Sequence, residues 1–319
     1  MKKVFYFCIT LSMSIFLISC SNESEKFESS SDRIIQSPIA FKHGEQEFEI
    51  INYYQETLDF LKATKEQPDN LEVLYKQSVL DTLRKNGFGY SELSDWMFTT
   101  PSDIEALEET MSKLIDKQVL LNDSIKEALL ESATLLPGGN KTIHVLPSWP
   151  EFGASMKEVN YVGGYVWNKD SILIQIDPSF LEEDLKYTVA HEYHHTVYRE
   201  MNADIWYSLL ENTLVEGKAD IFAKTIYPNV YVPWSEPLIE QENQKVWEIF
   251  RENMESTDSS FIEGFTHGNP YYGIPQWSTY RIGNQIMQSF LDENSGLSIE
   301  EWTKVSESDI FQKSKYYNK

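Results

Sequence analysis

The sequence predicts an α+β fold that is mainly helical and carries one small β-sheet beside a long helix. Apolar residues recur at helical spacing through most of the first third of the folded part. Three short runs with strand-like composition follow, and helical spacing then returns up to the C-terminus. Strands that are grouped together, instead of alternating with helices, are typical of the α+β class.

Helices and then strands are predicted in the first half of the folded part. The expected helices are 48–65, 71–85, 102–117 and 124–136, where Asn70 and Asp123 supply caps. A turn is expected at 137–140, and the expected strands are 142–146, 161–167 and 171–176.

Helices predominate again in the second half. The expected elements are a helix from the start signal Asp177-Pro178-Ser179 to about Arg199, a helix from about Asp204 to Ile226, a loop at 227–237, a helix through Val246, Ile249 and Phe250, a loop at 264–277, and two final helices, the second opened by a capping box at Ser298–Glu301. The chain shows no internal repeat and no second composition class. We therefore expect a helical N-terminal subdomain at 39–137 and one domain with the chemistry at 138–319.

Five consecutive residues, His191-Glu192-Tyr193-His194-His195, carry the strongest chemical signal. Residues four apart on a helix lie on one face, so His191 and His195 can bind one metal ion. Glu192 lies about 100° around the helix, beside the open position of the metal. On the same geometry His194 points away from His195, and we interpret it as a packing or surface residue. Two ligands and one base predict hydrolysis.

A catalytic zinc ion usually has three protein ligands, so a third must lie elsewhere. Asp204 and Glu211 are possible ligands, but no pattern supports them. Glu216 opens the segment Glu216-Gly217-Lys218-Ala219-Asp220 inside the second predicted helix. Because Glu216 and Asp220 share a face, Glu216 can bind the metal while Asp220 accepts the distal N–H of a ligating histidine.

The order of HExxH, about two dozen residues and ExxxD resembles the gluzincin, or thermolysin-like, metallopeptidases. The resemblance implies a zincin-like fold and a bound Zn²⁺. It implies that His191, His195 and Glu216 are the ligands, that Glu192 is the general base and that Asp220 is the supporting carboxylate.

A closer resemblance is to the YjaZ-like family of predicted zinc-dependent proteases, over roughly residues 140 to 319. The residues that carry it are Gly163-Gly164-Tyr165, the strand that ends at Asp177-Pro178, His191–His195, Val215-Glu216-Gly217, Tyr280-Arg281-Ile282-Gly283 and 298–302. In gluzincins an edge strand binds the extended peptide by backbone pairing. Here residues 161–167 or 172–176 would do so.

The developing oxyanion normally needs one more hydrogen-bond donor. Tyr280 is our first choice for this catalytic role and His267 the second, with Tyr271 and Tyr272 in the same region. Arg281 can bind a substrate carboxylate or pair with an acidic residue behind the metal ligands, and a surface or ion-paired arginine is at least as good an interpretation. The two remaining histidines, His144 in a predicted strand and His43 near the start of the domain, are left out of the site.

The N-terminus predicts export and lipidation. Lys2 and Lys3 precede an apolar run at 4–18, which is too short for a comfortable membrane span. The run ends in Leu17-Ile18-Ser19-Cys20, which resembles a bacterial lipobox. We therefore expect a lipoprotein signal peptide at 1–19, lipidation of Cys20 and a polar tether at 20–38. An ordinary secretory signal is the alternative.

Cysteine content and net charge indicate whether the mature chain has disulfides and which partners it can bind. The only cysteines are Cys8, inside the signal, and Cys20, so the mature chain has no disulfide. Loss of Lys2 and Lys3 leaves 25 basic against 50 acidic residues and a formal charge of −25 instead of −23. Such a charge argues against nucleic acid as a partner.

The sequence therefore predicts a zinc-dependent metallopeptidase that is lipid-anchored on the extracytoplasmic side of a bacterial membrane and acts on a peptide or protein substrate. The alternative is a non-catalytic envelope lipoprotein that binds metal or a partner through the same site. Glu192 favours the enzyme, because a pure binder has no use for an unliganded carboxylate beside the metal.

Overall fold

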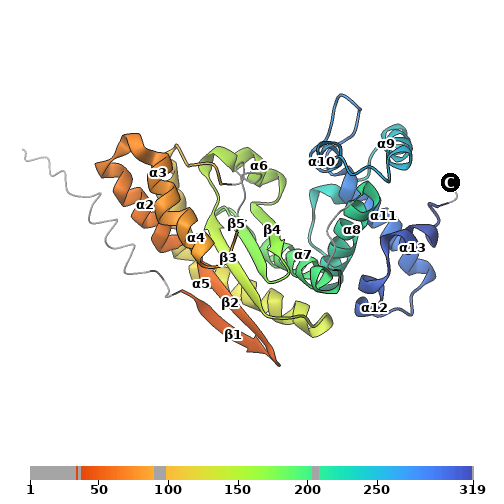
Figure 1. The fold of residues 1–319 in the computed structure, drawn as a ribbon, viewed down its shortest axis with the longest axis horizontal. Helices are drawn as coiled ribbons and strands as arrows, with labels where there is room; N and C mark the ends of the chain where they lie inside the picture. The colour runs from red at the N-terminus through yellow and green to blue at the C-terminus, as the bar shows by residue number, and fades with distance from the viewer. Residues whose placement is uncertain (1–33, 35–36, 90–97, 203–207, 318–319) are drawn as a thin grey trace, which may run out of the picture. The chain divides into compact units, whose positions relative to one another are not determined.

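A mixed five-stranded sheet supports the fold in the computed structural model, which describes residues 34, 37–89, 98–202 and 208–317 (Figure 1). Its strands are, in spatial order, β1 (Ile39–His43), β2 (Gln46–Asn52), β3 (Lys141–Pro147), β5 (Ser171–Ile176) and β4 (Val162–Asn168). The three inner strands run parallel, and the outer strands β1 and β4 are antiparallel to their neighbours. The edge strand β4 therefore pairs only with β5 among the described residues.

Helices make up most of the remaining described chain, so the predicted α+β, mainly helical fold is confirmed. They are α2 (Tyr54–Glu66), α3 (Leu71–Tyr75), α4 (Asp81–Lys85), α5 (Ile104–Leu135), α6 (Gly153–Glu158), α7 (Glu182–Met201), α8 (Leu209–Ile226), α9 (Glu240–Glu252), α10 (Ser259–His267), α11 (Ser278–Glu293), α12 (Ile299–Lys304) and α13 (Glu307–Gln312). Short turns of other helix types are η1 (Pro68–Asn70), η2 (Lys76–Leu80), η4 (Pro150–Phe152) and η5 (Pro233–Ser235).

The helix predicted from residue 48 is wrong over its first turn, because β2 extends to Asn52. In β2, Phe48 and Ile50 are buried while Glu47 and Glu49 alternate with them, which is the period of a strand. Helix α2 begins only at Tyr54. The strand pairs with β3, so the sheet includes residues from both sides of the predicted division at 137.

Other boundaries differ where burial continues across a predicted break. The helices predicted at 102–117 and 124–136 form the single helix α5, because Gln118, Leu121 and Asn122 continue its buried face. Asp123 is therefore no cap, and the side chain of Asp103 caps the helix instead. Helix α10 reaches into the loop predicted at 264–277, and α13 follows α12, whose predicted capping box is present.

Three helices carry the candidate site. Helix α7 packs against the strands β4 and β5, against α5 and against α8, and α8 in turn packs against α11 (Figure 1). The contact between α8 and α11 is close enough that a Cβ added at Gly217 would lie 2.6 Å from the carbonyl carbon of Gly283. Only glycine permits such close backbone contact, so this pair lets α11 pack directly on α8, the helix that carries the predicted ligand Glu216.

Several predicted residues and segments lie away from the candidate site or outside the described residues. His144 is a strand residue, as expected; it is fully buried, faces the Tyr53 hydroxyl across 2.9 Å, and burial lowers its pKa to about 4. The signal peptide, Cys20, most of the tether and Asp204 lie outside the described residues.

Within the ranges that the structure describes, no helix is long and apolar enough to cross a membrane.

Candidate metal centre

Three of the predicted ligands converge on one point. His191 and His195 project from α7, and Glu216 projects from the neighbouring α8. One donor atom of each lies within 4.8 Å of the others. Glu216 Oε2 is 3.2 Å from His191 Nε2 and 3.4 Å from His195 Nε2, and the two Nε2 atoms are 3.0 Å apart. The structure therefore brings together the three residues that the motif spacing predicts.

The donor set fits a zinc ion. Two imidazoles and one carboxylate form a ligand set of catalytic zinc sites, which keep a fourth position open. The three side chains come from two packed helices, so their positions are fixed by the helix contact and not by a loop. Glu211, which the sequence left as an alternative third ligand, has another role, because it forms the capping box of α8 with Ser208.

The charges within this group reinforce one another. Burial raises the pKa of Glu216, but the charge of His195 and hydrogen bonds from both histidines outweigh burial, so the pKa of Glu216 lies well below its usual range. Burial lowers the pKa of His191, and the hydrogen bond to Glu216 outweighs that effect and raises it. Glu216 is thus held as a carboxylate, the form that binds a cation.

Glu192 lies beside this group and faces the edge strand. It is buried, and burial raises the pKa of its carboxyl, although the charges of His195 and His191 act in the opposite direction. A Cβ added at Gly164 in β4 would lie 2.5 Å from both Cγ and Oε1 of Glu192. The backbone of β4 therefore passes directly over the Glu192 side chain. This close contact explains why residue 164 is a glycine.

We expect Gly164→Ala to lower kcat for peptide hydrolysis about 100-fold, because the added methyl group displaces Glu192 by about 1 Å and such a misplacement can cost two orders of magnitude. Gly163→Ala is the matched control, since its Cβ would meet nothing closer than 3.8 Å. Steady-state kinetics and zinc content of both variants check this. Equal activity of the two variants would show that the contact does not position Glu192.

Asp220 has different partners from those that the sequence predicts. Its Oδ1 accepts hydrogen bonds from the Tyr187 hydroxyl and from Trp234 Nε1 at 2.7 Å, and Oδ2 is 2.8 Å from Lys224 Nζ. His191 Nδ1 is buried and makes no hydrogen bond. Tyr187 lies one turn before His191 on α7, and its hydroxyl takes the place at the Asp220 carboxylate that the sequence assigns to a histidine. Asp220 therefore holds Tyr187 and Trp234 in place and makes no hydrogen bond to His191.

Tyr280 and His267 both border the same cavity as His191 and Glu192. Tyr280 is hydrogen-bonded to Glu216, and burial together with the charge of Glu216 raises its pKa well above the usual value, so its hydroxyl stays a proton donor. Its ring stacks on Trp234, with centroids 4.5 Å apart. His267 is exposed at the end of α10. Tyr271 is 88% exposed, and neither it nor Tyr272 is among the described residues that border the cavity.

The hydrogen bonds of Arg281 are made with backbone carbonyls. Its guanidinium donates to the backbone carbonyls of Glu236 at 3.0 Å, of Pro233 at 3.4 Å and of Gln276. Arg281 fastens the 233–236 segment to the start of α11, which places Trp234 beside Tyr280.

His194 is a packing residue, as predicted. It is fully buried, its Nε2 is 3.2 Å from Thr303 Oγ1, and its ring stacks on Trp302. On α8, the buried Lys218 binds the same segment, donating to Thr303 O at 3.1 Å and to Glu307 at 2.6 Å. The C-terminal helices α12 and α13 thus brace α7 and α8, the two helices that carry the candidate ligands.

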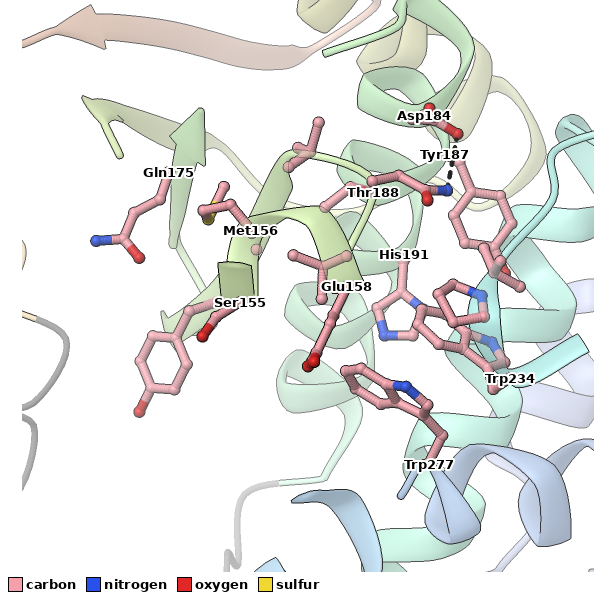
Figure 2. A pocket seen from close by; sticks show the side chains of 18 of the residues that line it. Ser155, Met156, Glu158, Gln175, Asp184, Tyr187, Thr188, His191, Trp234 and Trp277 are labelled. Atoms are coloured by element: carbon pink, nitrogen blue, oxygen red, sulfur yellow. Dashed lines mark hydrogen bonds between the residues drawn. The ribbon is translucent and has the colours of Figure 1, made fainter. Parts of the chain in front are cut away.

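A cavity of about 410 Å³ opens beside the metal group (Figure 2). It extends along α7 and under β4, and Trp234 and Trp277 form an aromatic wall with ring centroids 5.4 Å apart. Sequence reasoning missed this wall, because neither tryptophan belongs to a motif. Trp277 has a left-handed backbone with φ 64°, a strained conformation that often marks functional sites.

The fold and the site together define an α+β protein with a candidate catalytic metal centre of the HExxH type. The chain belongs to the family of predicted Zn-dependent proteases (DUF2268), which matches it over residues 121–312. That range includes the complete metal group and the bracing helices α12 and α13. Neither a curated protein nor a solved structure matches the chain.

Proposed function

We propose that this protein is a gluzincin-type zinc peptidase, similar to the YjaZ-like proteases, that hydrolyses peptide bonds with Glu192 as general base. The observation that carries the proposal is the convergence of His191, His195 and Glu216 beside a buried carboxylate that binds none of them. Bound to these three residues, zinc would lower the pKa of a water molecule toward about 7 and polarise the substrate carbonyl.

The residues of this chain would supply the remaining chemistry. Glu192 accepts the proton of the attacking water and passes it to the leaving amine. The free edge of β4 aligns an extended peptide over the site by backbone pairing, because this strand has one open side in the described sheet. Tyr280 or His267 donates a hydrogen bond to the developing oxyanion.

The direct test uses protein that begins near residue 34, where the compact unit starts. We expect about one zinc ion per chain and cleavage of peptides from an unbiased mixture, both abolished by a chelator and restored by zinc. A chain that binds zinc but cleaves no peptide would contradict the peptidase and support the non-catalytic alternative.

Tyr280→Phe is expected to lower kcat about 100-fold, the usual effect of removing one oxyanion donor, with a smaller effect for His267→Ala. Burial beside Glu216 and His191 favours Tyr280 over the exposed His267. Because Tyr280 also contacts Glu216, zinc content is measured for both variants. A larger loss for His267→Ala at full zinc occupancy would reverse the assignment.

We also propose that Cys20 carries a lipid that anchors the chain on the extracytoplasmic side of a bacterial membrane, with residues 20–38 as the tether. The support is the sequence Leu17-Ile18-Ser19-Cys20 after an apolar run of signal length. Mass spectrometry of the mature N-terminus tests this proposal, and an N-terminus without a lipid on Cys20 would contradict it.

A further inference from the structure

The cavity beside the metal group follows one face of α7. Asp184, Thr188 and His191 all border it, and their spacing places them on the same side of the helix (Figure 2). Asp184 lies about 10 Å along the helix axis from the metal ligand, at a rise of about 1.5 Å per residue. A side chain that enters beside His191 and extends along α7 therefore approaches a carboxylate at the far end.

The walls between these two points are largely apolar and contain no positive charge. Met156 and Val162 are buried in them, and Val159 and Val232 border the same space. Among the described residues that border the cavity there is no lysine or arginine, whereas Glu158 and Asp184 add carboxylates to that of Glu192. The cavity thus combines an apolar stem region with carboxylates that meet no lysine or arginine in its wall.

Asp184 is held in position rather than free to turn toward solvent. Its Oδ1 accepts a hydrogen bond from Asn160 Nδ2 at 3.1 Å, and the same amide donates to Tyr231 O at 2.7 Å. Asn160 has a left-handed backbone with φ 53°, at the turn that leads into β4. Burial raises the pKa of Asp184, and the only neighbouring charge that contributes is the like charge of Glu183.

These features decide between two kinds of occupant. An apolar side chain would strip water from the Asp184 carboxylate and offer it no partner, which is costly for a buried charge. A lysine or arginine side chain has a long apolar stem for the walls and a cation for the carboxylate, and a charge-assisted hydrogen bond replaces the lost water. The excess of acidic residues in the whole chain also attracts basic peptides.

We propose that this cavity is a specificity pocket for the side chain of lysine or arginine next to the bond that is cut, with Asp184 as the residue that selects it. The inference rests on the proposed peptidase function. It adds a substrate class, which is peptides with a basic residue beside the scissile bond.

The test uses zinc-loaded protein and peptides that differ only in the residues flanking one bond: lysine, arginine, leucine, phenylalanine or glutamate. We expect kcat/KM for the basic peptides to exceed that for the leucine peptide at least 10-fold. Asp184→Asn keeps an acceptor for Asn160 and is expected to lower this ratio about 10-fold. Asp184→Lys is expected to shift the preference toward glutamate.

The matched control is Glu183→Gln, which removes the same charge one residue away, on an exposed side chain that does not border the cavity. We expect it to leave the ratio unchanged. A parent enzyme that prefers leucine or phenylalanine, or an Asp184→Asn variant with an unchanged ratio, would overturn the pocket assignment while leaving the peptidase intact.

Measurements of peptide binding distinguish an incorrect pocket assignment from an incorrect peptidase assignment. If no peptide is cleaved, the proposed function fails, and binding of the same peptides to the Glu192→Gln protein, measured by calorimetry, still tests the pocket. Tighter binding of basic peptides that is lost on adding Asp184→Asn supports it. Equal binding of basic and apolar peptides overturns it.

Discussion

Glu192→Gln is expected to lower peptide hydrolysis by about 10²–10⁴-fold, the usual contribution of a general base. The amide keeps the size and shape of the side chain, so it still fits under the backbone at Gly164, but it cannot accept a proton. Glu192 is no member of the group of converging ligands, so zinc content is expected to equal that of the parent. Single-turnover kinetics and metal analysis of the purified variant measure both quantities.

Glu263→Gln is the control for this experiment, because it makes the same change on an exposed side chain of α10. It is expected to keep full activity. Undiminished hydrolysis by Glu192→Gln would remove Glu192 from the mechanism, and loss of zinc from that variant would instead make it part of the binding site.

The positions of the candidate ligands could be predicted because they depend mainly on helix geometry. The spacing of His191 and His195 places both rings on one face of any straight helix, and it leaves Glu192 beside them. The position of Glu216 also depends on a second helix that packs against the first. The apolar residues around the ExxxD segment predicted that helix. These positions follow from local periodicity and from one helix contact, and the structure has both.

Asp220 and Arg281 show where sequence reasoning stops. A buried carboxylate binds whichever donors the tertiary fold brings to it, and here the 233–236 segment brings Trp234 while α7 brings Tyr187. Arg281 takes backbone carbonyls of that same segment as partners. No pattern in the chain encodes the path of such a loop, so neither partner set could be read from spacing.

Helix and strand boundaries were mispredicted where two periodicities compete. Residues before Tyr54 contain apolar side chains that satisfy both a strand and a helix, and pairing of β2 with β3 decides for the strand. In α5 the polar residues Gln118 and Asn122 resemble a break, but both are buried on its inner face. Burial of a polar side chain depends on its neighbours in space, which the local sequence does not contain.

Glu216→Gln is expected to weaken zinc binding by more than about 100-fold, which exceeds the 10–100-fold loss that is typical when a residue behind a ligand is changed. The amide removes the negative charge that both histidines face at 3.2 and 3.4 Å, and a neutral oxygen is a poorer zinc ligand. Competition with a chelating dye measures the affinity. Asp220→Asn is expected to cost no more than about 10-fold, because Asp220 contacts Tyr187 and Trp234 and not a ligand.

The matched control is Glu211→Gln, the same change one and a half turns earlier on α8. Glu211 is an alternative ligand by sequence, but in the structure it closes the capping box with Ser208, a role that glutamine can also fill. Zinc affinity of this variant is therefore expected to equal that of the parent. If Glu211→Gln lost zinc and Glu216→Gln retained it, the third ligand would be Glu211, and α8 would have to be rotated relative to α7 from the arrangement described above.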